Sequence, residues 1–189
     1  MVVRDTDATR CRTCFLQLYV KGWYLYCWGD TDTLRAEKNN GIGMLDKTLI
    51  GKSFPPLLVD VDKWQLKFFA KAVNEENPIY FDEQAAIAEG YRSILAPPTY
   101  GVTLGCAVPD PFARAKAVGL DATKILHTAQ SFEYFEPICG GDQITLVATI
   151  TDVFEKRGGA FKFMIEETVA TNQLGQLTTR FRQTVVERA

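Results

Sequence analysis

Four segments near the end of the chain alternate apolar with polar residues, and this pattern most constrains the fold. The turns between them, such as Gly140-Gly141-Asp142 and Arg157-Gly158-Gly159, have the composition of β-hairpin turns. Long strands that are half apolar indicate an antiparallel sheet with one face covered. Residues predicted to share a face are Ile144, Leu146, Ala148 and Ile150, and likewise Phe161, Phe163 and Ile165. The predicted strands are residues 125–136, 143–155, 160–171 and 177–186.

The cover for this sheet is predicted to be a helix at residues 99–108, which carries no charge on any face. A helix that is apolar all round is a buried one. Gly101 and Gly105 lie four residues apart in it, a spacing that predicts close approach of another backbone. Residues 112–124 are predicted to form a loop or a short helix.

A first strand and two further helices are predicted upstream. Residues 53–61 indicate an edge strand, with Pro55-Pro56 near its start. Asp62 is a candidate N-cap for an amphipathic helix that buries Leu66, Phe69, Ala70 and Val73, and Asn77-Pro78 is expected to end it. Asp82 can cap a second short helix that runs through Ala88, and Gly90 can terminate it. Together these elements predict an α+β hot dog fold, with an antiparallel sheet of about five strands around a central buried helix.

Composition excludes several classes of function. The chain has 189 residues, and 21 basic against 23 acidic side chains give a formal net charge of −2, without the basic footprint of a nucleic-acid-binding protein. No apolar run approaches the roughly 18 residues that span a bilayer. Five scattered cysteines do not make a disulfide framework, so we expect a cytoplasmic protein. We expect no metal and no cofactor.

Residues 1–43 differ in composition from the rest and are predicted to be an N-terminal extension, disordered or foreign to the native protein. They hold three of the five cysteines and two of the three tryptophans. Cys11 and Cys14 have the spacing of half a zinc ribbon, but too few further ligands follow for a tetrahedral site. A domain is predicted to occupy residues 44–189.

A polar turn at residues 74–82 and a Pro-Pro turn at residues 94–100 are the candidate site. The motifs around them are Glu76-Asn77-Pro78-Ile79-Tyr80, Ala96-Pro97-Pro98-Thr99 and, further on, Gln130-Ser131-Phe132-Glu133-Tyr134. With Gly51-Lys52-Ser53-Phe54-Pro55-Pro56, Gly90-Tyr91, His127 and Pro137 leading to Gly141-Asp142, these motifs resemble the MaoC-like hydratase/dehydratase superfamily, in its FAS1-like dehydratase N-terminal branch. The resemblance covers about three quarters of the chain.

The resemblance implies hydration of trans-2-enoyl thioesters to (R)-3-hydroxyacyl thioesters, or the reverse dehydration. Active members use an Asp/His pair on the water and a glycine N–H in an Ala-His-Gly turn on the thioester oxygen. In this sequence Glu75 takes the Asp position and Tyr80 the His position, while Pro97 and Pro98 replace His and Gly. Tyrosine is a poor substitute for imidazole at neutral pH, and proline has no N–H to donate. The Thr99 amide is the neighbouring candidate donor.

The resemblance therefore implies a dehydratase or hydratase component, a lyase of fatty acid metabolism, that acts on acyl-CoA or acyl-carrier-protein (acyl-ACP) substrates with a catalytic partner subunit. The alternatives are a non-catalytic acyl-thioester-binding subunit and a hot dog thioesterase. We expect a homodimer or a heterodimer with a second hot dog subunit, and no nucleic-acid or membrane partner. Glu75 and Tyr80 are the candidate catalytic residues, both of unsuitable or doubtful type. The candidate substrate-binding residues are Asn77, Pro78, Phe81, Ala96, Pro97, Pro98, Thr99 and Tyr100.

Overall fold

The structure, a computed structural model, describes residues 45–188. The predictions for residues 1–43, including the extension and the Cys11/Cys14 pair, lie outside this range. No helix among the described residues is long and apolar enough to cross a membrane.

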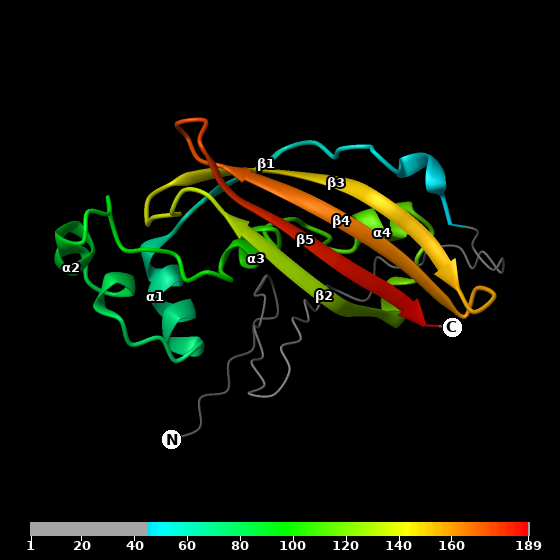
Figure 1. Cartoon of the computed structure of the whole chain (residues 1–189), viewed down its shortest axis with the longest axis horizontal. Helices are drawn as coiled ribbons and strands as arrows, with labels where there is room; N and C mark the ends of the chain where they lie inside the picture. The colour runs from blue at the N-terminus through cyan, green and yellow to red at the C-terminus, as the bar shows by residue number, and fades with distance from the viewer. Residues whose placement is uncertain (1–44, 189) are drawn as a thin grey trace, which may run out of the picture. The chain divides into compact units, whose positions relative to one another are not determined.

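One antiparallel sheet of five strands dominates the described residues (Figure 1). Its spatial order is β1-β3-β4-β5-β2. The predicted five-stranded sheet is confirmed, and β1 lies at an edge as expected, although it is shorter than the predicted 53–61. The strands are β1 Leu57–Asp60, β2 Ile125–Tyr134, β3 Gln143–Lys156, β4 Phe161–Thr171 and β5 Leu177–Arg188.

Alternation along β3 places its apolar side chains on the covered face of the sheet. Ile144, Leu146, Ala148 and Ile150 are all buried, as predicted. A register shift lies between Ile150 and Asp152. Because this bulge adds one residue to the strand, Val153 is buried on the same face as Ile150.

On β4 the alternation has the opposite sense from the one that hydrophobicity suggests. Phe161, Phe163 and Ile165 do share a face, but they are only half-buried and alternate with buried Met164 and Glu166. Met164 belongs to one buried cluster with Ala115 and Val118, so the aromatic face of β4 is the one turned away from the helices. Phe163 stacks there on Phe154 of β3, with ring centroids 4.8 Å apart.

Helices α1 (Lys63–Ala72) and α2 (Glu83–Ala88) start at the predicted caps. Asp62 accepts a hydrogen bond from the Gln65 amide at 2.9 Å, and Asp82 accepts one from the Ala85 amide at 2.8 Å. The prediction that Asn77-Pro78 ends α1 is wrong: the helix stops at Ala72, and Asn74 follows with φ of 57°. That left-handed residue reverses the chain before the proline is reached.

The predicted helix at residues 99–108 is much shorter in the structure. Helix α3 spans only Gly101–Leu104, with Gly101 and Leu104 buried. Two glycines and the β-branched residues Val102 and Thr103 lower the helix propensity of this segment. Its apolar composition indicates that the segment is buried, not that it is helical over its whole length. The predicted approach of another backbone segment is not seen among the described residues. A Cβ on Gly101 would meet the Phe181 side chain at 3.9 Å, and a Cβ on Gly105 would meet the Val102 carbonyl oxygen of its own turn at 3.3 Å.

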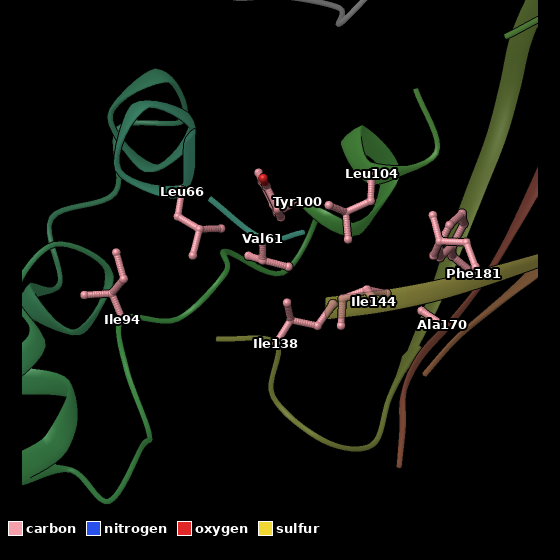
Figure 2. Packing of buried hydrophobic residues seen from close by; sticks show 10 residues of the cluster. Val61, Leu66, Ile94, Tyr100, Leu104, Ile138, Ile144, Ala170 and Phe181 are labelled. Atoms are coloured by element: carbon pink, nitrogen blue, oxygen red, sulfur yellow. The ribbon is translucent and has the colours of Figure 1, made fainter. Parts of the chain in front are cut away.

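Two hydrophobic clusters cover one face of the sheet. In the first, α1 and α3 pack on the end of the sheet near β1, with Tyr100 and Leu104 against Ile144 and Phe181 (Figure 2). In the second, Ala115 and Val118 pack on Ile150 and Val153. The second cover comes from α4 (Ala113–Ala117), within the region predicted to be a loop or short helix. Three short 3-10 turns complete the described fold: η1 Lys47–Leu49, η2 Pro78–Tyr80 and η3 Ala122–Lys124.

Candidate functional site

Backbone hydrogen bonds join the two segments that the sequence singles out. The Leu95 amide donates to the Ile79 carbonyl at 3.1 Å, which ties the Pro-Pro turn to the polar turn. The Ala96 amide donates to Ile138 at 2.8 Å, and the Gly140 amide donates to Ile94 at 2.8 Å. The candidate residues are thus held together at the end of the sheet where β3 begins.

The side chains of Asn77 and Glu75 are both used to order the polar turn. Asn77 Oδ1 accepts from the Ile79 amide at 3.1 Å and caps the η2 turn. Glu75 Oε1 accepts from the amides of Glu76 at 3.0 Å and Asn77 at 3.1 Å. The Asn77 side chain therefore orders the turn, and one oxygen of Glu75 accepts hydrogen bonds from the backbone.

Tyr80 lies half-buried at the end of η2, with Phe81 half-buried beside it and Pro78 exposed at its start. Burial raises the pKa of the Tyr80 hydroxyl, and the charge of Glu75 raises this pKa further. The hydroxyl therefore stays protonated at neutral pH. It can donate a hydrogen bond but is a weak acid and no base under these conditions.

The second half of the Pro-Pro turn lies at the protein surface. Pro97 is buried and Ala96 half-buried, whereas Pro98 and Thr99 are exposed. The Tyr134 hydroxyl of β2 donates to the Pro98 carbonyl at 3.0 Å and fixes the turn against the sheet. No acceptor among residues 45–188 receives the Thr99 amide proton, so this N–H is available as a donor to a bound carbonyl.

Tyr100 connects the turn to helix α1 and belongs to the core as much as to the site. Its ring packs edge-on against Phe69, with centroids 5.4 Å apart and planes at 81°. Its hydroxyl donates to Gln65 Oε1 at 3.3 Å. Because Tyr100 is 2% exposed, it supports the wall of the site from behind.

Asp142 is a site-supporting residue whose role the sequence did not reveal, although it follows the Gly140-Gly141 turn. Its carboxylate is 2% exposed and binds both terminal nitrogens of Arg92, at 2.6 Å and 3.0 Å. It also accepts from the Cys139 amide at 2.8 Å and Gln173 Nε2 at 3.0 Å. The segment that leads into the Pro-Pro turn is therefore clamped to the sheet by one buried carboxylate.

Next to this clamp the chain packs with no room for a side chain at Gly140. A Cβ there would lie 2.7 Å from Lys63 Cγ and 3.2 Å from Ile94 Cγ1. His127 is part of a different region: it is exposed at an irregularity of β2, where its Nε2 lies 3.0 Å from the Ala129 carbonyl oxygen. The structure assigns the histidine a local backbone contact.

Comparison with known proteins identifies the family. The profile described as "FAS1-like, dehydratase domain region" matches residues 48–180, well over half of the chain. The chain therefore belongs to the FAS1-like dehydratase domain family, within the MaoC-like hot dog proteins.

Two relatives are about one third identical to this chain. A "UPF0336 protein" of Leifsonia xyli subsp. xyli is 33% identical over 152 residues, which cover 76% of this chain and 96% of the relative. Another "UPF0336 protein", from Saccharopolyspora erythraea, is 32% identical over 118 residues, or 62% of this chain and 76% of the relative.

Solved structures share the fold. The C-terminally truncated HadBC (3R-hydroxyacyl-ACP dehydratase) complex from Mycobacterium tuberculosis includes a chain that superposes with a TM-score of 0.64 at 28% identity, covering 73% of this chain and 96% of that one. The (R)-hydratase of A. caviae involved in PHA biosynthesis has a TM-score of 0.57 at 17% identity, covering 72% and 94%. The predicted family and hot dog fold are confirmed, and a hydratase/dehydratase function is supported at the level of the family.

Proposed function

We propose that this chain is the acyl-holding component of an (R)-specific 3-hydroxyacyl-thioester dehydratase, or 2-enoyl-thioester hydratase, and that a second hot dog subunit supplies the Asp/His pair. The observation that carries the proposal is the state of the two replaced positions. Glu75 orders its own turn through two backbone amides, and the Tyr80 hydroxyl has a raised pKa. Neither group matches the base and acid that the reaction requires near neutral pH.

The rest of the pocket is consistent with binding a thioester. Asn77 orders the turn, Tyr134 donates to the Pro98 carbonyl, and the Thr99 amide donates to no acceptor among residues 45–188. A free amide beside an exposed proline turn can hold a thioester oxygen. Pro78, Phe81, Ala96 and Pro97 would then provide the walls along the acyl chain.

An open sheet edge supports a two-subunit assembly. Within the described strands, β2 pairs with β5 alone, so its other edge offers unpaired backbone groups. Two similar structures, HadBC and the ChsH1-ChsH2 complex of Mycobacterium tuberculosis, are complexes of two named components. We propose that a second hot dog subunit adds to this edge, as a homodimer or as the catalytic heterodimer.

Turnover by the full chain alone and with a second subunit tests the proposal. The partner would be a hot dog protein from the same organism with an intact Asp-x-Asn-Pro-x-His motif, and the assay would follow the absorbance of a conjugated enoyl thioester. We expect turnover to rise about 100-fold or more over either subunit alone, as general acid–base groups contribute. Equal turnover by the chain alone would contradict the partner requirement. Release of free thiol without hydration would indicate a thioesterase, and unaltered partner activity would indicate a binding subunit only.

Substitutions at Glu75 separate a structural role from a catalytic one. In the assembled enzyme we expect Glu75→Gln to keep activity within about twofold, because the amide oxygen can still accept the two backbone hydrogen bonds. Glu75→Ala is expected to cost about 1 kcal/mol in urea unfolding. The matched control, Glu76→Ala, changes an exposed neighbour and should cost less than about 0.5 kcal/mol. A loss of activity beyond tenfold in Glu75→Gln would instead make Glu75 a general base.

A further inference from the structure

The outer face of helix α1 exposes a pair of large aromatic side chains. Trp64 is 69% exposed and Phe68 is 50% exposed, and their rings stack with centroids 5.5 Å apart and planes at 15°. The core-facing side of the same helix is already supplied by Leu66 and Ala70, both fully buried. The aromatic pair therefore adds nothing to the core. Exposed apolar groups that gather in one place mark an interaction surface.

A row of lysines runs beside the aromatic pair. Lys63, Lys67 and Lys71 recur every four residues, which places them side by side along about 12 Å of the helix. The helix itself contains no acidic residue. Lys63 forms a salt bridge with Glu83, and the Glu83 carboxylate also attracts Lys67. No carboxylate of residues 45–188 forms a salt bridge with Lys67 or Lys71, so these two side chains stay available to a partner. Like charges at this spacing repel one another, so the row is suited to an anionic partner.

Helix α1 also contacts the candidate site through Gln65 and Phe69, which follow Trp64 and Phe68 directly and lie about 100° further around the helix. Gln65 accepts the hydrogen bond from Tyr100, and Phe69 packs on the Tyr100 ring. In Figure 1, α1 and α2 lie together at one side of the sheet, and α1 leads directly into the polar turn. A partner bound on the outer face of α1 would therefore be held next to the acyl-thioester pocket.

We propose that this surface, formed by Trp64, Lys67, Phe68 and Lys71, docks the acidic surface of an acyl carrier protein that delivers the thioester. The inference rests on the proposed function and selects the carrier protein over coenzyme A. A nucleotide would require a concave site, whereas this is the outward side of a surface helix. Carboxylates on a partner helix complement the lysine row, and an apolar side chain between them fits the stacked rings. The net charge of −2 disfavours a nucleic acid on the same surface.

The test uses the full chain in its assembled enzyme and the variant Lys67→Glu/Lys71→Glu. The holo acyl carrier protein of the same organism, labelled with a fluorophore, is the binding probe in an anisotropy titration at low and at high salt. We expect the dissociation constant to rise about tenfold at low salt and the difference to shrink at high salt. We expect KM for an enoyl-carrier protein to rise in parallel, with KM for the same enoyl-CoA unchanged within about twofold.

Matched variants control for net charge and for folding. Lys47→Glu/Lys52→Glu reverses two exposed lysines at the start of the described chain and should leave carrier binding unchanged within about twofold. Lys67→Gln/Lys71→Gln removes the charges without reversal and should give a smaller rise in the same direction. Trp64→Ala should weaken binding about fivefold or more at both salt concentrations, because the ring contact is not screened.

The outcomes separate docking from catalysis. If the α1 variants and the control bind the carrier protein alike, the docking proposal is overturned, even when turnover supports the proposed function. If no thioester is turned over but binding depends on Lys67 and Lys71, the docking surface stands and the proposed function fails. If the α1 variants lose the wild-type protein's binding to a labelled single-stranded RNA but still bind the carrier protein, the surface is a nucleic-acid site and the proposal is overturned.

Discussion

Replacing Arg114 with alanine is expected to lower the free energy of unfolding by about 3–5 kcal/mol. Arg114 of α4 forms a bidentate pair with Glu166 of β4, with NH2 to Oε1 at 2.9 Å and Nε bonded to Oε2. Glu166 is 1% exposed, so within residues 45–188 the loss of Arg114 leaves this buried carboxylate with Gln183 Nε2, at 3.1 Å, as its one remaining side-chain donor. Urea unfolding of the full chain followed by circular dichroism measures the change.

The same helix provides the control. Lys116 pairs with Asp110 at 2.8 Å, but the two side chains are 41% and 42% exposed. Lys116→Ala should therefore cost less than about 1 kcal/mol. Arg114→Met combined with Glu166→Leu should cost less than Arg114→Ala alone, because neither charge remains buried. Similar losses for Arg114→Ala and Lys116→Ala would show that Glu166 is not held by this pair.

The second large effect is expected at Asp142, where substitution by asparagine should cost about 3 kcal/mol near neutral pH. Burial by itself would raise the pKa of Asp142, but hydrogen bonds from Arg92, the Cys139 amide and Gln173 outweigh it and lower this pKa below its ordinary value of 3.8. The ionised Asp142 carboxylate therefore stabilises the fold fully at pH values above the pKa that this aspartate has in the unfolded chain. This contribution is lost as the pH falls through the lower pKa of the folded state.

Urea unfolding at several pH values tests the sign of this effect. The stability difference between wild type and Asp142→Asn should be constant between about pH 5 and pH 7 and should shrink below about pH 4. Asp121→Asn is the control, because Asp121 caps the η3 turn at the surface and asparagine is also a good N-cap; it should cost less than about 1 kcal/mol. A difference for Asp142→Asn that grows on acidification would contradict the clamp.

The strands of β3, β4 and β5 were predictable because their alternation and their glycine turns are local signals. The ion pairs were not, because their partners are far apart in sequence: Arg114 and Glu166 are 52 residues apart, and Arg92 and Asp142 are 50 residues apart. Hydrophobicity also could not reveal which face of β4 is covered. The strand places Glu166 inward and Phe163 outward, which only the tertiary pairing with α4 explains.

The candidate site was predictable in its outline and not in its contacts. Asn77 orders its turn as a residue of that type before proline is expected to do. The sequence places Glu75 and Tyr80 at the chemical positions, but only the structure shows the Glu75 carboxylate bound to its own backbone. Helix α3 was overestimated, because a run of uncharged residues records burial whether or not the backbone is helical.

The strand order has a consequence for how the protein family can diversify. β3, β4 and β5 form a continuous meander, and β1 and β2 are added on its two outer edges. Every candidate site residue lies between β1 and β2, and the ladders of the five strands include none of residues 61–124. The candidate site is thus encoded apart from the strands of the sheet. Side chains at positions such as Glu75, Tyr80 and Pro98 can therefore be replaced without breaking a hydrogen bond of the strand ladders.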